Sequence, residues 1–254
     1  MDNRPQLWLV DDDPEMGVIV GLLCRRGELS LTCFGDVASA WQAWEGEAPR
    51  PALVLLDVNL PGESGLALLR RWRKAGRTPA VALFCQPGLA RDIAAGWAEG
   101  ADYLVSKGLV ADPDGWSRRV GEIISRADGD SPPQTLEWLA EERGDKAVSW
   151  GRILSRATEQ PELRALGGAV LTQVVRRCLV SGFGPAASAC LHPVSGRVSA
   201  LALARPATPG QARAVLRSLV DQVDRLLGRA AALGCEQRLL AAWIAPPTSH
   251  VARH

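Results

Sequence analysis

Three carboxylates and one lysine are the residues of this chain that could do chemistry together. Asp11 and Asp12 directly follow the apolar run QLWLV, and Asp57 directly follows ALVLL. Lys107 follows YLV after one intervening residue, Ser106. Clustered anions repel one another, and a hard divalent cation with oxygen ligands, such as Mg²⁺, relieves that repulsion. A carboxylate beside Mg²⁺ can attack a phosphoryl group to form an acyl phosphate, and a lysine pairs with the added charge.

The elements that must position these residues alternate regularly between strands and helices. The apolar patterns predict strands at 6–10, 29–34, 52–56, 80–84 and 103–105, and helices at 15–26, 37–45, 66–74, 89–99 and 112–126. Such alternation predicts an α/β domain with a doubly wound parallel five-stranded sheet, flavodoxin-like, with helices on both faces. Ligands of such sheets bind beyond the carboxyl ends of the strands, where the acids and the lysine stand.

Residues 5–126 resemble the receiver (CheY-like) domain of two-component response regulators. The similar stretches are LVDDDP with its acidic pair, LLDVNLPGESGL around Asp57, and GADYLVSK ending at Lys107. The resemblance implies that Asp57 is phosphorylated by a histidine kinase or a phosphotransfer protein, and that Lys107 supports the phosphoryl group. It also implies that Mg²⁺ is the cofactor, held by Asp11, Asp12, Asp57 and the main-chain carbonyl of Asn59. Pro61-Gly62 would turn the chain away from the site.

The sequence departs from the family pattern at two places near this site. Receivers normally have a Thr or Ser hydroxyl at the end of the fourth strand. Here either Phe84, counted from Pro79, or Cys85, counted back from Gly100, takes that position, and neither is a good hydroxyl donor. Gly108 replaces the usual proline after the lysine, so the loop loses a fixed turn. These departures concern how phosphorylation would be coupled to helix movement, and not the chemistry at Asp57. Two plainer alternatives stay open, an ordinary solvated acidic rim and an intact receiver that is rarely phosphorylated.

The stretch ADGDSPPQ at 127–134 is small, polar and proline-bearing, which is typical of a domain boundary. We therefore expect a receiver domain at 1–126, a linker with a short helix (135–143) at 127–146, and an output domain at 147–254. The patterns in the output domain predict a strand at 147–153, a helix at 162–179, a hairpin over 186–204, a helix from Pro209 capped by Thr208, and a strand at 239–244. That β-α-β-β-α-β order is an α+β, ferredoxin-like arrangement.

The output domain resembles, weakly, a degenerate GGDEF domain. The similar stretches are GGAVLTQVVRRCL and SGRVSALALARPATPGQARAVLRSLVDQV. The hairpin turn at 195–199 lacks the acids that two-metal phosphoryl chemistry requires, so we expect no enzyme activity. The Gly167-Gly168 pair lies in a helical stretch and is interpreted as a packing or kink feature. His192 is interpreted as a structural turn residue.

Bulk properties limit the environment and the partners. The 254 residues fit two domains, with a net charge of +1, 47% hydrophobic and 22% charged residues. No apolar run approaches ~20 residues, and acids follow the first apolar stretch, so we expect a cytoplasmic protein without a membrane partner. The six cysteines form no C-x-x-C pair, which favours free thiols packed as small hydrophobes.

The leading hypothesis for output is protein binding, through a partner or a homodimer, controlled by phosphorylation of Asp57. Trp97 and Trp116 are candidate surface residues, although burial is the default for tryptophan. One alternative is a degenerate domain that binds a nucleotide, GTP or cyclic di-GMP. Another is a DNA-binding transcription regulator. The pairs Arg176-Arg177 and Arg213/Arg217 are better explained as solvated helix faces, so DNA is expected to be an unlikely partner.

Overall fold

The computed structural model describes residues 4–76, 79–86, 89–127, 161–185, 187 and 208–244. Contacts within the chain divide it into two compact units, residues 1–134 and 135–254. The helix expected at 135–143, the strand expected at 147–153 and His192 lie outside the described residues, as does the hairpin expected over 186–204 except for residue 187. Within the described part of the chain, no helix is long and apolar enough to cross a lipid bilayer.

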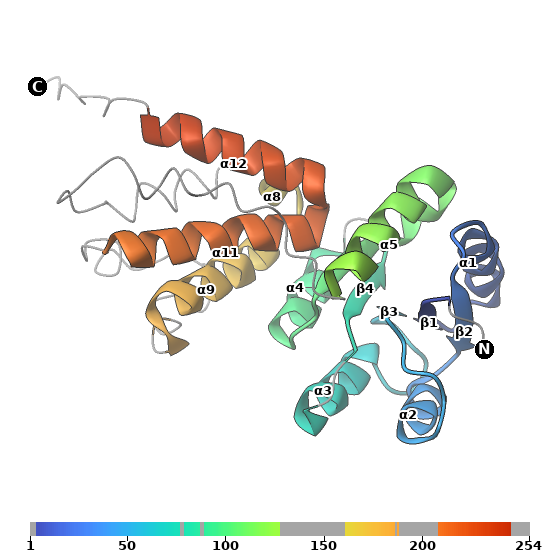
Figure 1. Ribbon diagram of the computed structural model, residues 1–254. Coiled ribbons are helices and arrows are strands. Elements are labelled where there is room, and N and C mark those ends of the chain that lie inside the picture. Colours follow the sequence, from blue (N-terminus) through green and yellow to red (C-terminus); the bar gives the residue numbers. More distant parts are fainter. Residues whose placement is uncertain are drawn as a thin grey trace, which may run out of the picture. The chain divides into compact units, whose positions relative to one another are not determined.

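The first unit is built on a five-stranded parallel sheet (Figure 1). The strands are β1 (Gln6–Val10), β2 (Ser30–Phe34), β3 (Leu53–Leu56), β4 (Val81–Cys85) and β5 (Tyr103–Ser106), in the order β2-β1-β3-β4-β5. Every neighbouring pair is parallel, and the register matches Leu9 with Leu55, Leu56 with Leu83, and Phe84 with Val105. The fold predicted for this half from its alternating pattern is confirmed, and no strand end differs from its predicted position by more than one residue.

Helices α1 (Pro14–Arg26) and α5 (Pro113–Ala127) cover one face of the sheet. Alternate strand residues point toward them because successive side chains of a strand face opposite sides. The resulting core contains Leu9, Leu55, Phe84 and Val105 from the strands, with Trp116 of α5. Trp97 and Trp116, considered as surface candidates, are both fully buried, so neither is available to a partner in this structure.

Helices α2 (Val37–Glu45), α3 (Gly65–Ala75) and α4 (Ala90–Ala98) connect the remaining strands. Trp8 of β1 contacts Trp44 of α2 edge to face at 6.2 Å, and Trp44 contacts Trp72 of α3 at 5.7 Å. Edge-to-face pairs at these distances are favourable beyond the area that they bury. Gly96 of α4 lies so close to Leu83 that a Cβ there would be 2.6 Å from the leucine methyl carbons. These contacts fix the helices of this layer on β1 and β4.

The described part of the second unit is helical, with α8 (Pro161–Ala165), α9 (Gly168–Phe183), α11 (Pro209–Leu227) and α12 (Arg229–Ile244). The single helix expected at 162–179 is interrupted at Gly167, whose φ of 86° ends one helix and precedes the next. This agrees with the interpretation of the Gly167-Gly168 pair as a kink. Thr208 forms a complete capping box with Gln211, which confirms the expected start of α11.

The strand expected at 239–244 is wrong, because the backbone there is the last part of α12. A six-residue apolar run does not distinguish a buried strand from a buried helix. The preceding alanines, 230–232, favour a helix, and that helix continues through LLAAWI to Ile244. The β-α-β-β-α-β order predicted for this unit therefore loses its last strand.

Candidate functional site

Backbone hydrogen bonds of the sheet bring Asp11 and Asp57 to one edge. The N–H of Asp11 donates to the carbonyl of Phe34 at 2.9 Å, and the N–H of Asp57 donates to the carbonyl of Val10 at 2.9 Å. Each aspartate thus prolongs its strand by one residue before the chain turns away. Asp11 is 6% exposed and Asp57 is 7% exposed, which argues against an ordinary solvated acidic rim at these two positions. Asp12, in contrast, is exposed.

Lys107 joins the two buried carboxylates. Its Nζ lies 2.5 Å from Oδ2 of Asp57 and 2.8 Å from Oδ2 of Asp11, and its side chain is 10% exposed. Burial by itself would lower the pKa of Lys107, but the hydrogen bonds and the charges of Asp11 and Asp57 outweigh burial and raise that pKa. The lysine therefore stays charged and neutralises part of the acidic cluster.

The residues of the cluster fit a divalent cation. One ligand oxygen each from Asp11, Asp12 and Asp57 can be chosen so that all three lie within 4.8 Å of one another. Oδ2 of Asp11 is buried and accepts no hydrogen bond of good direction, even though Lys107 is close enough for an ion pair. An acceptor of this kind costs free energy unless something else binds it. Burial also raises the pKa of Asp11, because Lys107 and the N–H of Asp13 offset only part of the cost of removing this carboxylate from water.

Hydrogen bonds of the β3–α3 loop hold the Asp57 carboxylate and the loop after it. The N–H of Asn59 donates to Oδ1 of Asp57 at 2.9 Å. Ser64 caps α3, accepting from the N–H of Leu66, and its hydroxyl donates to the carbonyl of Val58 at 2.9 Å. Gly62 has a φ of 79°, which a glycine adopts without strain, so the predicted turn after Pro61 is present.

The side chain of Asn59 makes a contact that the sequence analysis did not anticipate. Its Nδ2 donates to Oδ2 of Asp92 in the first turn of α4 at 3.2 Å. The N-cap residue of α4, Leu89, forms no side-chain cap, so this bond supports the start of that helix. Nothing in the spacing of Asn59 and Asp92, 33 residues apart, indicates the contact.

Phe84 and Cys85 end β4 on opposite faces of the sheet. Phe84 is fully buried in the core beneath α1 and α5, and its ring centroid lies 5.7 Å from Nζ of Lys107. Cys85 is also buried. Burial raises the pKa of its thiol to about 11, with smaller contributions from the charges of Asp57 and Asp92. Both residues are therefore neutral neighbours of the cluster, and Phe84 is the one that contacts Lys107.

The segment after Lys107 is ordered without proline. Residues Lys107–Ala111 form a 3-10 helix, η1, whose cap is Ser106. The N–H of Gly108 donates to the hydroxyl of Ser106 at 3.2 Å, a bond that a proline at 108 could not make. The sequence analysis expected this loop to lack a fixed turn without proline, but the cap by Ser106 fixes its backbone.

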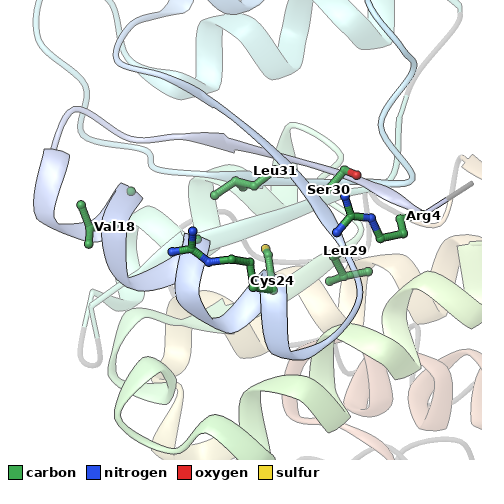
Figure 2. A pocket seen from close by; sticks show the side chains of 9 residues that line it. Arg4, Val18, Cys24, Leu29, Ser30 and Leu31 are labelled. Atoms are coloured by element: carbon green, nitrogen blue, oxygen red, sulfur yellow. The ribbon is translucent and has the colours of Figure 1, made fainter. Parts of the chain in front are cut away.

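A hollow of about 480 Å³ lies away from the acidic cluster, between α1 and the edge strand β2 (Figure 2). Gly17 and Gly21 leave room there, since a Cβ at either position would meet its nearest neighbour at an ordinary 3.7 Å. Arg4 and Arg25 contribute its charged groups, and none of its lining residues is acidic. Chemistry at the carboxylates does not involve this hollow.

Comparisons with known proteins agree with the geometry of the first unit. Residues 7–113 match the family described as response regulator receiver domain. The transcriptional activator protein PfeR of Pseudomonas aeruginosa is 39% identical over 103 residues, which are 41% of this chain and 33% of that protein. The DNA-binding response regulator MtrA of Mycolicibacterium smegmatis is 33% identical over 104 residues, 41% of this chain and 44% of that protein. A crystal structure of a putative response regulator from Chloroflexus aurantiacus is 24% identical, with a TM-score of 0.43, over 49% of this chain and all of that chain.

The first unit is therefore a response regulator receiver domain. The chain spans less than half the length of the two curated relatives named here, so the match says nothing of residues beyond the receiver. The printed names of those relatives describe a transcriptional activator and a DNA-binding regulator. They conflict with the prediction that DNA is an unlikely partner, and that exclusion is withdrawn.

Proposed function

We propose that this chain is a response regulator in which Asp57 accepts a phosphoryl group from a histidine kinase or a phosphotransfer protein. The observation that supports this best is the buried Asp57 carboxylate, fixed by the N–H of Asn59 and paired with Lys107 at 2.5 Å, inside a receiver fold. A carboxylate oxygen of Asp57 attacks the phosphorus, and the bond from phosphorus to the donor's leaving atom breaks with its electron pair.

The chain's own residues prepare this step in three ways. Asn59 fixes Oδ1 of Asp57 through its backbone N–H, which leaves Oδ2 beside Lys107. Lys107 supplies an ammonium donor to a phosphoryl oxygen as negative charge arrives. Asp11, Asp12, Asp57 and the main-chain carbonyl of Asn59 would hold Mg²⁺, which neutralises phosphoryl oxygens when bound.

Incubation with acetyl phosphate and Mg²⁺, followed by intact-protein mass spectrometry, tests the acceptor. We expect the wild-type protein to gain one phosphoryl group and Asp57→Asn to gain none. Asp92→Asn is the matched control, since Asp92 is a neighbouring carboxylate outside the acidic cluster. A wild-type protein that stays unmodified, or an Asp57→Asn variant that is modified equally, contradicts the proposal.

For the output, we propose that phosphorylation alters a protein-binding surface, with a partner or with a second copy of the chain. In the described part of the second unit, α9 and α11 pack together and bury Val174, Cys178 and Leu219. Such packed helices can present a surface to a partner. Leu233 of α12 is a large apolar side chain left 47% exposed. Sedimentation velocity with and without beryllium fluoride, a phosphoryl analogue, checks whether the oligomeric state follows the site.

DNA binding is the second candidate output, because the relatives are named as a DNA-binding regulator and a transcriptional activator. It predicts a complex with DNA that weakens steeply as salt rises, since contacts to phosphates release counterions. A mobility-shift series at several salt concentrations, with and without phosphorylation, distinguishes it from protein binding. Absence of any shift at low salt removes this candidate.

A degenerate GGDEF-like identity for residues 147–254 stays a proposal that rests on sequence resemblance. Helices α9 and α11 lie where that resemblance implies helices, and α12 lies where it implies a strand. The missing acids predict no cyclic dinucleotide from GTP and Mg²⁺. Calorimetric titration with GTP and with cyclic di-GMP tests whether the unit binds a nucleotide without turning it over.

A further inference from the structure

Phe84 occupies the end of β4 beside the candidate acceptor, with its ring against Lys107. The phenyl group is fully buried, and the ring centroid is 5.7 Å from the ammonium nitrogen. A cation within about 6 Å of an aromatic face is attracted by the ring quadrupole, more strongly where water is excluded. Only 10% of the Lys107 side chain is exposed, so this ammonium is largely shielded from water.

Three groups therefore determine where the ammonium of Lys107 lies: the carboxylates of Asp11 and Asp57, and the ring of Phe84. The carboxylates supply the charge that attracts it. The ring is the rigid partner, because Phe84 is packed in the core with Leu55 and Val105 of the adjacent strands. A lysine stem is flexible and samples many rotamers, so a fixed apolar surface beside it limits the positions that the ammonium group takes.

We propose that Phe84 is a positioning residue for Lys107, whose ring holds the ammonium at the acceptor carboxylate in a site where β4 offers no hydroxyl. This rests on the proposed function of Asp57. A phenyl group donates no conventional hydrogen bond to a phosphoryl oxygen, so Phe84 acts on an incoming anion through the lysine. Loss of the ring should weaken anion binding only while the lysine is present.

Binding of beryllium fluoride to the full chain in the presence of Mg²⁺, measured by isothermal titration, tests this. We expect Phe84→Leu and Phe84→Met to weaken binding by roughly 3- to 10-fold, the range that a largely desolvated cation–π contact gives. Phe84→Tyr keeps the ring and should bind like the wild type. Two apolar variants are used so that a folding failure in one, detected by circular dichroism, leaves the other to decide.

The double-mutant cycle with Lys107→Met separates positioning from general packing. In the Lys107→Met background, Phe84→Leu should cause no further loss of affinity. Phe34→Leu is the control for a lost aromatic, because Phe34 also ends a strand and packs edge to face on Trp8 at 4.8 Å. We expect it to bind the analogue as the wild type does.

Different failures of this experiment have different meanings. Unchanged affinity in both apolar Phe84 variants, an equal loss in the Lys107→Met background, or an equal loss in Phe34→Leu overturns the positioning role alone. A wild-type chain that does not bind the analogue at all overturns the proposed acceptor function, and the positioning role with it. The acetyl phosphate assay reports on the acceptor independently.

Discussion

Nζ of Lys107 and Oδ2 of Asp57 lie 2.5 Å apart, and each side chain is only 10% exposed. Such a buried pair contributes little net stability when intact, because both groups lose their hydration. Removal of one partner is costly, since it leaves a buried charge uncompensated. The same geometry that prepares Asp57 for an anionic substituent therefore makes the unit's stability sensitive to the charge at position 107.

Lys107→Met should destabilise the protein by about 2 kcal/mol in the absence of divalent cations, because Asp11 and Asp57 then repel without a counter-charge. Added Mg²⁺ should raise the unfolding midpoint of this variant more than that of the wild type, since it replaces the lost positive charge. Denaturant unfolding with EDTA and with Mg²⁺ measures both effects. Lys74→Met, at the end of α3, is the control and should respond to Mg²⁺ as the wild type does. If Mg²⁺ raises the unfolding midpoint of Lys107→Met by no more than that of the wild type, then Lys107 and Mg²⁺ do not neutralise the same carboxylates.

Gly65→Ala should unfold easily and also disturb the acceptor. A Cβ at Gly65 would overlap the backbone carbonyl oxygen of Asp57, and backbone there cannot yield without moving the carboxylate. We expect the free energy of unfolding to fall by roughly 1–3 kcal/mol, as is typical of overpacking, and acetyl phosphate to label the variant less. Gly121→Ala is the matched variant, because it lies within α5 with nothing within 4 Å of its Cβ position. Its free energy of unfolding, measured with denaturant, should rise by about 0.5–1 kcal/mol. Equal effects of the two variants would refute the close approach.

Asn59→Ala should loosen the start of α4 and leave the acetyl phosphate labelling of Asp57 intact. The variant loses the side-chain bond to Asp92 but keeps the backbone N–H that binds Oδ1 of Asp57. Hydrogen exchange should rise about 2- to 10-fold at residues 93–96, whose N–H groups are the first in α4 to donate within the helix. That range corresponds to the loss of one hydrogen bond. Asp114→Ala, in the first turn of α5, is the control. Unchanged exchange in Asn59→Ala would show that the bond does not stabilise α4.

The buried thiol of Cys24 predicts a loss of stability at alkaline pH. Burial raises the pKa of Cys24 to about 12 from an ordinary 9.0, with a smaller contribution from Cys33. The folded state then binds more protons than the unfolded state between these two values, so the free energy of unfolding falls as pH rises through that window. Urea unfolding from pH 8 to pH 11 should show a shallower decline in Cys24→Ala than in the wild type. Parallel curves would contradict the shifted pKa. Val20→Ala is the control, because it truncates another buried side chain of α1 without removing a thiol, and its decline should follow that of the wild type.

The sequence by itself determined the receiver fold and the residues at its functional edge. Short apolar runs alternate along the first half with longer segments of helical period, and this regular order predicts a parallel sheet. A parallel sheet places the residues after each strand at one edge. The positions of Asp11, Asp57 and Lys107 therefore follow from their place after strands, whatever the side-chain packing. The sequence also predicted the helix that begins at Pro209 with Thr208 as its cap, because caps act through residues that are near in the chain.

Only the tertiary structure decided which neighbours those residues have. Phe84 and Cys85 are adjacent in sequence, and the register of β4 against β5 alone places the phenyl ring under Lys107. The bond from Asn59 to Asp92 joins the β3–α3 loop to the first turn of α4, and no local sequence pattern relates these two segments. The run 239–244 is apolar enough for either a buried strand or a buried helix, and only the structure shows that α12 continues through it to Ile244.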